Sequence, residues 1–448
     1  MPACSDHAGT PSGPVASSVP LASPGHGGLP RALYLHIPFC VRRCRYCDFY
    51  SNAVSHADPL VGEYAEALAA LVTRLGSAGC LDELATAYVG GGTPTMAGEA
   101  LTTLVSSVST ATVGRLAEFS SEANPESLTS ELASRLAEAG LTRVSLGVQS
   151  FRDEELERLG RSHDSRRAAE AARAVVDAGL DLSVDLMCGI PLQTAESWRR
   201  SLEAALACGA GHVSCYPLTV EEGTEMARRV DAGLEQAPDE DFQAELMVEA
   251  ERVLGARGLV RYEVASYALP GRRCAHNVAY WTGAPYLGLG PGASGMLEGE
   301  ALRLLDGVAL FVDSDDDGPS SAEAMTPAEV LLRHPDAWRF RFRMLGDARG
   351  FVRAMRLGEP VACEVECLTR REAAAEDLML GMRMSDGLGA DVLERAVASG
   401  VPAADLDRTL ASLVAEGLVR RLENGSFVPT ERGWLLGNRV YGALWDLA

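Results

Sequence analysis

Short apolar runs alternate with longer segments of helical periodicity from residue 32 to residue 219. The strand-like runs cover 32–38, 85–92, 116–125, 143–150, 182–191 and 212–219. Between them, apolar residues recur at helical spacing in 59–75, 129–139, 165–178 and 194–207. Six strand-then-helix units predict an α/β fold with a parallel sheet. Because the rhythm weakens after residue 219, we expect a partial (β/α)6 barrel of the TIM type rather than a full barrel.

The chain divides into four expected regions. Residues 1–30 are rich in Pro, Gly and Ser, which predicts a disordered extension. Residues 31–300 hold the barrel core with its flanking elements, and 301–369 form a connecting segment. Residues 370–448 have three helical patterns and a hairpin that turns at Asn424-Gly425, which predicts a small winged-helix-like α+β domain.

The connecting segment contains an acidic stretch at 312–326 that imitates the start of a calcium loop. Asp313, Asp315 and Asp317 have the spacing of the first calcium ligands. However, Ala324 stands at the twelfth position, where such loops have Glu, and Pro319 stands at the backbone-ligand position. We therefore predict a solvated linker.

The charge balance narrows the range of partners. All 40 basic residues are Arg, against 62 acidic residues and a net charge of -22. The absence of Lys excludes lysine Schiff bases, lysine-anchored pyridoxal phosphate and the Walker A lysine. Nucleic acid and anionic membrane surfaces are disfavoured partners, because a protein that binds either of them usually presents clustered positive charge. The acidic helical pattern at 403–416 also argues against DNA reading by the tail.

The cysteine count and the hydropathy bear on the compartment. Eleven Cys is an odd number, which disfavours a complete disulfide framework. Residues 1–30 lack the basic and apolar parts of a secretory signal, and no run approaches the length of a membrane span. We expect a cytoplasmic protein, in which reducing conditions favour metal-binding or buried roles for cysteine.

Cys40, Cys44 and Cys47 form a C-x3-C-x2-C triplet in the loop after the first predicted strand. Three thiolates so close in sequence can hold three irons of a [4Fe–4S] cube and leave the fourth iron open to a ligand. Arg42, Arg43 and Arg45 would partly offset the charge of such a cluster. The alternatives are a zinc site, which would want a fourth nearby ligand, or unrelated buried thiols.

The triplet, its HIPFC lead-in and Tyr46 resemble the radical S-adenosylmethionine (SAM) superfamily. More narrowly, they are similar to the oxygen-independent coproporphyrinogen III oxidase (dehydrogenase) family and its HemW-type haem chaperone branch. The resemblance runs from about residue 31 to the C-terminus, outside the acidic loop. It implies the radical SAM class of barrel and an open iron that binds the amino and carboxylate groups of SAM. One-electron reduction would then cleave the sulfonium to a 5′-deoxyadenosyl radical.

Polar residues at successive strand ends support SAM binding. A glycine run closes the second strand, where backbone can approach a ligand closely, although a tight turn would also explain it. Arg161 could hold a carboxylate bidentately. By resemblance, eight residues fall on positions that contact SAM in this group: Tyr34, Gly91, Gly92, Thr93, Glu122, Gln149, Arg161 and Asp185.

Two features separate the branches of the family. Coproporphyrinogen dehydrogenases typically extend the triplet by a further cysteine, where this sequence has Phe49. The run from His276 to Trp281 matches the HNxxYW pattern associated with the HemW branch. Imidazole can ligate haem iron, so His276 is the haem candidate, with Cys274 as a second. Alternatively, His276 is an ordinary loop histidine, with Tyr280 and Trp281 packing the barrel rim.

The leading hypothesis is a haem chaperone that binds a SAM-ligated [4Fe–4S] cluster and delivers haem, its cargo, to respiratory acceptor proteins. It would need a reductant for the cluster. Homodimerisation and transient docking on membrane proteins stay open. The second hypothesis is a radical enzyme that decarboxylates coproporphyrinogen III or otherwise modifies a tetrapyrrole. The third is a zinc-bound interaction module.

Overall fold

The computed structural model describes residues 28–313 and 324–448. Except for residues 28–30, the predicted N-terminal extension lies outside these ranges, as does most of the acidic stretch at 312–326. Six parallel strands form the centre of one large sheet: β1 (Ala32–Ile37), β4 (Thr86–Gly91), β5 (Glu118–Ala123), β6 (Arg143–Gln149), β7 (Asp181–Cys188) and β8 (His212–Pro217). The predicted partial (β/α)6 barrel is therefore confirmed.

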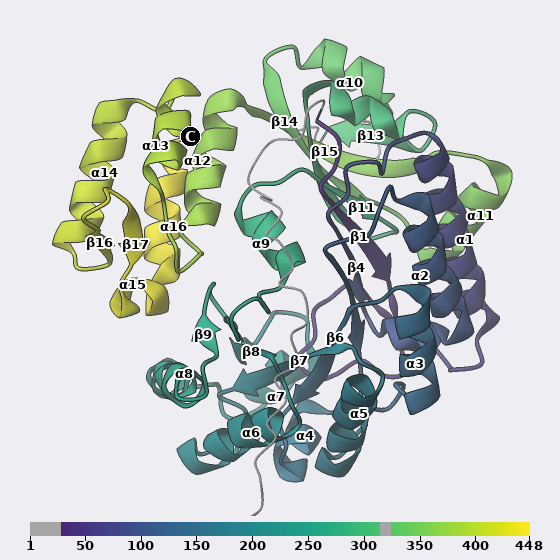
Figure 1. Ribbon diagram of the computed structural model, residues 1–448, viewed down its shortest axis with the longest axis vertical. Helices are drawn as coiled ribbons and strands as arrows, with labels where there is room; N and C mark the ends of the chain where they lie inside the picture. Colours follow the sequence, from purple (N-terminus) through teal and green to yellow (C-terminus); the bar gives the residue numbers. More distant parts are fainter. Residues whose placement is uncertain (1–27, 314–323) are drawn as a thin grey trace, which may run out of the picture.

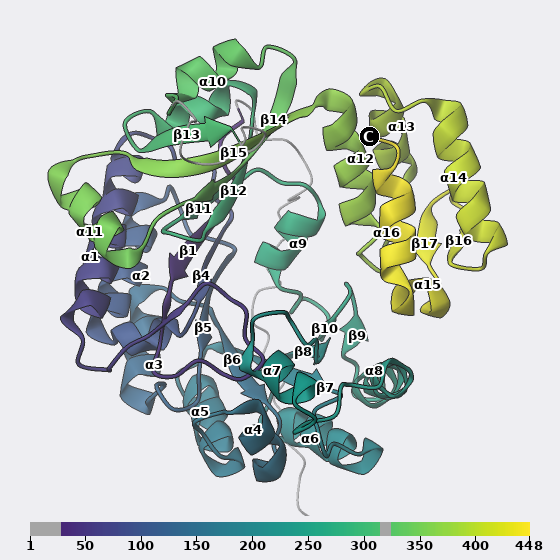
Figure 2. The ribbon, with the colours of Figure 1, turned by 180° about the vertical axis from the view of Figure 1, so that it is seen from behind.

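Helices cover the outer face of this sheet (Figures 1 and 2). They are α1 (Pro59–Ser77), α2 (Glu99–Ala111), α3 (Ser130–Ala139), α5 (Ser165–Asp177), α6 (Ala195–Ala207) and α8 (Glu240–Gly255). Two short helices, α4 (Asp153–Leu159) and α7 (Glu225–Asp231), instead contact the segment after β1, where the Arg45 amide donates to the Leu159 carbonyl and the Met226 amide donates to the Arg45 carbonyl. The sequence patterns predicted α1, α3, α5 and α6 to within a few residues, and α2 was expected from the six strand-then-helix units but without a range. In α2, Leu101, Leu104, Val105 and Val108 are buried, but Ser and Thr occupy much of the other face. Ser and Thr weaken the propensity signal of a helix without weakening its packing.

The sheet continues beyond both ends of the barrel, where the sequence rhythm fades. On the β8 side it adds β10 (Ser266–Ala268) and β9 (Val260–Arg261), both antiparallel to their neighbours. On the β1 side it adds β11 (Tyr286–Leu289), β12 (Ser294–Glu298), β14 (Ala337–Met344), β15 (Val361–Thr369) and β13 (Ala309–Asp313). The short elements η2 (Gly299–Leu305), α10 (Pro327–Arg333) and α11 (Ala348–Leu357) connect these strands.

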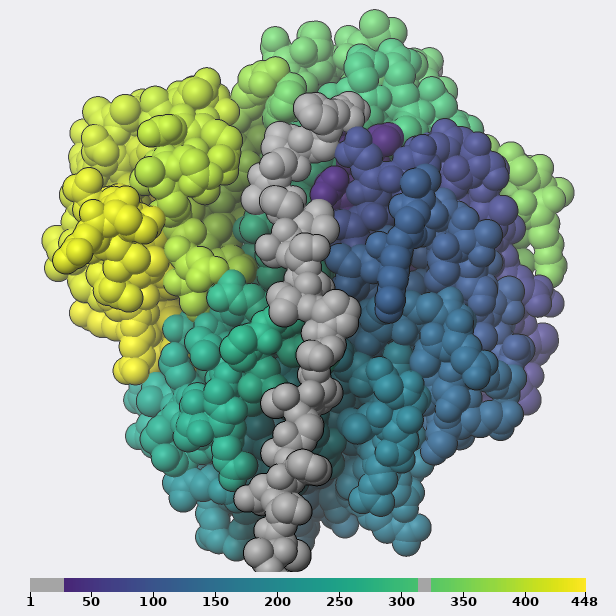
Figure 3. All heavy atoms as spheres, in the orientation of Figure 1, coloured from purple at the N-terminus to yellow at the C-terminus, as the bar shows by residue number. Residues whose placement is uncertain are grey.

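The tail forms a lobe beside the barrel (Figure 3). Its helices are α12 (Arg370–Gly381), α13 (Ala390–Ala398), α14 (Ala403–Ala415), α15 (Glu431–Leu435) and α16 (Gly437–Trp445). The predicted hairpin joins β16 (Val419–Arg421) to β17 (Phe427–Pro429), and Gly425 in its turn has a φ of 85°. The lobe has its own hydrophobic cluster, built on residues such as Leu378, Leu410 and Leu444. The winged-helix-like prediction is confirmed, with five helices instead of three.

Candidate functional site

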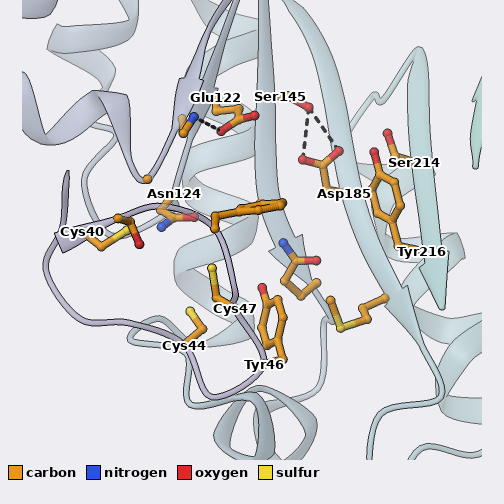
Figure 4. A pocket seen from close by; sticks show the side chains of 18 of the residues that line it. Cys40, Cys44, Tyr46, Cys47, Glu122, Asn124, Ser145, Asp185, Ser214 and Tyr216 are labelled. Atoms are coloured by element: carbon orange, nitrogen blue, oxygen red, sulfur yellow. Dashed lines mark hydrogen bonds between the residues drawn. The ribbon is translucent and has the colours of Figure 1, made fainter. Parts of the chain in front are cut away.

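A cavity of about 360 Å³ lies inside the barrel and reaches the carboxyl ends of its strands. In parallel barrels this end of the strands carries the active site. Figure 4 shows thiols, carboxyls and hydroxyls from different strands around this space. Nine of the predicted site residues line the cavity: Cys40, Cys44, Cys47, Gly91, Gly92, Glu122, Gln149, Arg161 and Asp185. The remaining three do not line it: Tyr34, Thr93 and His276.

The cysteine loop, residues 40–51, closes over the mouth of the cavity. Cys40 ends the short strand β2 (Phe39–Cys40), which pairs in parallel with β3 (Asn52–Ala53) and so closes the base of the loop. Arg42 Nη2 donates to the carbonyl oxygens of Gly160 at 2.5 Å and Arg161 at 2.9 Å. These contacts fasten the loop to the chain that follows α4. The guanidinium of Arg42 therefore binds backbone carbonyls, a role that the sequence did not reveal.

The three thiols suit a multinuclear cluster better than a single metal ion. All three face the cavity (Figure 4). Yet among residues 28–313 and 324–448, no group of three His, Cys, Asp or Glu side chains is placed to hold one ion. A zinc site needs its ligands to converge on one point, whereas each cysteine of a [4Fe–4S] cube binds its own iron. Three thiols around one cavity therefore fit the cube as a donor set.

Burial affects the protonation of the thiols. It raises the pKa of Cys40, against hydrogen bonds from Thr93 and Ser51. Burial also raises the pKa of Cys47 to about 11, against a backbone hydrogen bond at Phe49. Both thiols are therefore protonated at neutral pH in the metal-free protein, and any metal that they bound would have to displace these protons.

The glycine run at the end of β4 makes close contact with the chain that leads into the cysteine loop. A Cβ on Gly92 would lie 2.4 Å from the carbonyl oxygen of Phe39, and one on Gly91 would lie 2.7 Å from the imidazole of His36. Gly91 also has a φ of 118°, which favours glycine. Packing and backbone conformation alone therefore require glycine here, which agrees with the tight-turn alternative. Gly91 and Gly92 also line the cavity.

Two carboxyls enter the cavity without a cationic partner among the described residues. Glu122 Oε2 accepts a hydrogen bond from the Gly91 amide at 3.0 Å, and Ser145 Oγ lies 3.1 Å from both carboxyl oxygens of Asp185. Burial, with repulsion from Asp185, raises the pKa of Glu122 to about 8. Burial raises the pKa of Asp185 to about 6, although hydrogen bonds from Ser145 and Ser214 lower it. A cationic ligand beside these two carboxyls would favour their charged forms.

Arg161 and Gln149 lie close to the cysteine loop. The Nη1 atom of Arg161 donates to Cys44 Sγ at 3.3 Å, and its Nη2 donates to Asn124 Oδ1 at 2.7 Å and to the Gly147 carbonyl at 2.6 Å. Its buried Nε has no hydrogen-bond partner among the described residues. Gln149 ends β6 with a φ of 67°, next to a register shift in the β6–β7 pairing. Strained backbone of this kind is often found at binding sites.

Tyr34 and Thr93 lie behind the lining. The hydroxyl of Tyr34 is 3.0 Å from His36 Nδ1, and its ring stacks on Tyr88 with 6.3 Å between centroids. Thr93 is 1% exposed, and its hydroxyl donates to Cys40 Sγ at 3.6 Å. In this geometry both residues support residues that line the cavity.

The geometry of His276 favours the packing alternative left open by the sequence. His276 is 1% exposed, with Nδ1 3.0 Å from Thr86 Oγ1 and Nε2 3.0 Å from Tyr280 Oη. Burial lowers its pKa to about 4. Both ring nitrogens therefore have partners inside the protein. The second candidate, Cys274, donates its thiol hydrogen to Glu118 Oε1 at 3.1 Å and is also buried.

Sequence reasoning missed several residues of the cavity. Asn124 lies two residues after Glu122, in the run that was singled out for its carboxylate, and this proximity was the available signal. Tyr216, at the end of β8, also lines the cavity, and Arg143, at the start of β6, lies at its floor. Periodicity cannot show which inward residues of different strands share one space. Cys188 and Cys215 are buried in the barrel core.

Comparison with known proteins adds the family context. Residues 34–205 match the radical SAM superfamily, and residues 368–436 match the HemN C-terminal domain. The chain is 41% identical over 276 residues to a heme chaperone HemW of Mycobacterium tuberculosis, covering 60% of this chain and 70% of the relative. It is 30% identical to the HemW of Bacillus subtilis over 422 residues, covering 92% and 98%. The HemW of Escherichia coli is 36% identical over 280 residues, covering 61% and 73%.

One solved structure matches nearly the whole chain. It is the coproporphyrinogen III oxidase HemN of Escherichia coli, described as a radical SAM enzyme. The TM-score is 0.70 with 19% sequence identity, over 95% of this chain and 92% of that one. At this identity the match establishes the fold.

Proposed function

Because this chain belongs to the HemW family of the radical SAM superfamily, we propose that it is a haem chaperone that binds haem and delivers it to acceptor proteins. The observation that carries the proposal is the match to named haem chaperones, which in the Bacillus subtilis relative covers 92% of this chain. The acceptors would be haem-containing respiratory proteins. The cysteine loop supplies the second part of the proposal, a metal cofactor beside the haem.

In the proposal Cys40, Cys44 and Cys47 hold a [4Fe–4S] cluster. When bound, the cluster supplies an open iron for SAM and a path for one electron. The donor set supports this assignment, because three thiols from one loop line one cavity. The loop is already closed by the β2–β3 pair, so the thiols need little reorganisation.

SAM would bind across the strand ends above the carboxyls. Glu122 and Asp185 offer negative charge to its ammonium and sulfonium groups, and a cation nearby would lower the pKa of both carboxyls. The Nε of Arg161, which has no hydrogen-bond partner among the described residues, would donate to the carboxylate of SAM. Gly91, Gly92 and Gln149 line the same space and would contact the rest of the molecule. Tyr34 and Thr93 would act from behind.

For the haem we propose the mouth of the cavity rather than His276. Two aromatic side chains there line the cavity yet remain exposed, Phe49 at 64% and Tyr216 at 41%. Aromatic rings suit the flat apolar face of a macrocycle. Arg43 lies beside Phe49, with Nη2 3.4 Å from the Phe49 carbonyl, and offers positive charge to the propionates. His276 could reach the iron only after losing its contacts to Thr86 and Tyr280.

The setting of the protein is also part of the proposal. Among residues 28–313 and 324–448, no helix is long and apolar enough to cross a membrane. We propose a cytoplasmic location, where reducing conditions favour metal-binding or buried roles for cysteine. The net charge of -22 favours acceptor docking through specific contacts over attraction to an anionic bilayer. A reductant would supply the electron for the cluster. Two copies of the chain could also form a homodimer.

A paired experiment tests the proposal. The reconstituted protein is titrated with haem and then incubated anaerobically with reductant, SAM and coproporphyrinogen III. We expect stable 1:1 haem binding without protoporphyrinogen formation. Rapid decarboxylation with SAM consumption would overturn the proposal in favour of the radical dehydrogenase. A Cys40→Ala variant that keeps a full complement of iron and sulfide would overturn the cluster assignment.

The position of the haem needs its own variants. Phe49→Ala removes a ring from the cavity mouth, and we expect several-fold weaker haem binding in an absorbance titration. Leu332→Ala is the control, because Leu332 is 79% exposed and does not line the cavity. Equal haem affinity in Phe49→Ala and the control would rule out the mouth as the haem site.

A further inference from the structure

We propose that Asn124 is a positioning residue that joins two of the cluster cysteines through one chain of hydrogen bonds. The proposal rests on the cluster assignment above. Asn124 would not itself bind the cluster. Its hydrogen bonds would set the geometry of the Cys40 and Cys44 thiolates and, through them, the reduction potential of the cluster.

The chain of contacts is continuous from sulfur to sulfur. Asn124 Nδ2 donates to Thr93 Oγ1 at 2.8 Å, and Thr93 Oγ1 donates to Cys40 Sγ at 3.6 Å. In the other direction, Asn124 Oδ1 accepts from Arg161 Nη2 at 2.7 Å, and Arg161 Nη1 donates to Cys44 Sγ at 3.3 Å. The amide of Asn124 is thus used once as donor and once as acceptor.

The members of this chain come from separate parts of the barrel. Thr93 follows β4, Asn124 follows β5, and Arg161 follows α4. The strand ends therefore set the spacing of the two thiols from outside the cysteine loop. Cys47 is different, because its thiol interacts with the backbone of Phe49 in the same loop.

The backbone around Asn124 is shaped to admit its side chain. A Cβ on Gly147 would lie 2.9 Å from Asn124 Oδ1 and 3.5 Å from Arg161 Nη2. The first distance is too short for a carbon–oxygen contact, so a larger residue at position 147 would displace the Asn124 amide, whereas the second is an ordinary contact. The Gly147 carbonyl also accepts from Arg161 Nη2 at 2.6 Å, so the guanidinium is held from two sides.

These contacts have a direct chemical consequence for a bound cluster. Hydrogen bonds to cysteine sulfurs are among the factors that set the potential of iron–sulfur clusters. A donor stabilises the more negative, reduced cluster more than the oxidised one, so it raises the potential. Removing Asn124 frees the hydroxyl of Thr93 and the guanidinium of Arg161 together. The potential should then fall and the cluster should be lost more readily.

The experiment compares the reconstituted full-length protein with three variants, without haem. In Asn124→Ala we expect a more negative midpoint potential by redox titration and ~10-fold faster iron loss to a chelator. Thr93→Val should shift the potential in the same direction by less, and Thr93→Ser should restore it. If Asn124→Ala retains no cluster, the difference in midpoint potential between Thr93→Val and Thr93→Ser tests the proposal instead.

Asn277→Ala is the matched control, since Asn277 lines the same cavity but has no contact with the chain of hydrogen bonds. A merely structural role for Asn124 would change the unfolding midpoint of the apoprotein and leave the potential where the control has it. Potentials equal to that of Asn277→Ala in both Asn124→Ala and Thr93→Val would overturn the proposal. This outcome is separate from failure of the cluster assignment, which would appear as full iron content in Cys40→Ala.

Discussion

At the scale of single residues, the ionisation of the buried carboxyls depends on what surrounds them. Burial raises the pKa of both Glu122 and Asp185, and outweighs the hydrogen bonds to each carboxyl and the charge of Arg161 near Asp185. Burial also acts on Glu118, but Arg143 at 3.2 Å and hydrogen bonds from Cys274 and Ala275 outweigh it, so that the pKa of Glu118 is lowered. Burial alone therefore does not fix the charge of a carboxyl in this barrel, because a nearby guanidinium can reverse the direction of the pKa shift.

A pH series on Glu122→Gln tests the raised pKa of this carboxyl. Folded Glu122, with a pKa of about 8, keeps its proton between pH 4.5 and 8, whereas the unfolded chain has lost it. The protonated Glu122 side chain therefore contributes fully to the free energy of unfolding below pH 4.5, and this contribution is lost as the pH rises through about 8. The free energy of unfolding of the wild type, minus that of Glu122→Gln, should therefore fall between pH 5 and 8 in urea titrations.

Asp185→Asn provides an internal comparison for this pH series. The pKa of Asp185 is raised from 3.8 to about 6, so its difference curve should complete its fall at lower pH. Difference curves that stay flat from pH 5 to 9 for both variants would contradict the raised pKa values.

At the scale of elements, the cysteine loop depends on the carboxyl end of α4. A short helix leaves its last carbonyls without intrahelical partners. Arg45 Nη1 donates to the Glu157 carbonyl at 3.0 Å, the Arg45 amide donates to the Leu159 carbonyl at 3.0 Å, and Arg45 Nε pairs with Glu225 at 3.0 Å. The loop thereby completes the helix, and the helix holds the loop.

Arg45→Met keeps much of the apolar stem and removes the guanidinium. We expect faster amide hydrogen exchange in residues 41–51 and lower iron content after reconstitution, with little change in the exchange of the barrel strands. Arg166→Met, on α5, is the control, because the Arg166 side chain is 84% exposed and pairs only with Glu170 among the described residues. Equal exchange of the loop in both variants would show that α4 does not hold it.

At the scale of the whole molecule, a buried arginine joins the extended sheet to the C-terminal lobe. Arg339 on β14 is 2% exposed and contacts Glu298 of β12 at 3.1 Å, and Glu376 and Asp377 of α12 at 2.8 Å. Removing one side of a buried charge network leaves the opposite charges unpaired. The position of the lobe beside the barrel therefore depends on this residue.

Arg339→Met should lower the free energy of unfolding by ~3–5 kcal/mol in urea titrations. Arg343→Met is the matched control, four residues along the same strand. The Arg343 side chain is 57% exposed and pairs with Glu364, so its loss should cost ~0–1 kcal/mol. Similar losses in the two variants would mean that the buried network adds nothing beyond a surface ion pair.

The His276–Trp281 run also belongs to this scale. It forms α9 (Ala275–Trp281), which lies between the barrel strands and the C-terminal lobe in Figures 1 and 2. His276 contacts Thr86 at the start of β4, while the Arg383 guanidinium lies 5.2 Å from the Trp281 ring. In this arrangement the run connects two parts of the molecule.

The sequence by itself determined the features that depend on local pattern. The spacing of apolar residues predicted the strands and helices of the six-unit barrel, because that spacing matches the geometric period of each element. The Asn424-Gly425 turn predicted the hairpin of the tail. The Cys40, Cys44 and Cys47 triplet was visible because its members lie within one loop. The polar residues at strand ends predicted one shared site, because the carboxyl ends of parallel strands lie at the same end of a barrel.

Only the tertiary structure decided how distant residues meet. Thr93, Asn124 and Arg161 are separated in the chain, and their contacts exist because three neighbouring segments end together. It also placed His276 inside the protein, with both ring nitrogens in contact, because α9 folds back against β4. A motif specifies residue types, whereas burial and hydrogen-bond partners depend on how the chain packs in three dimensions.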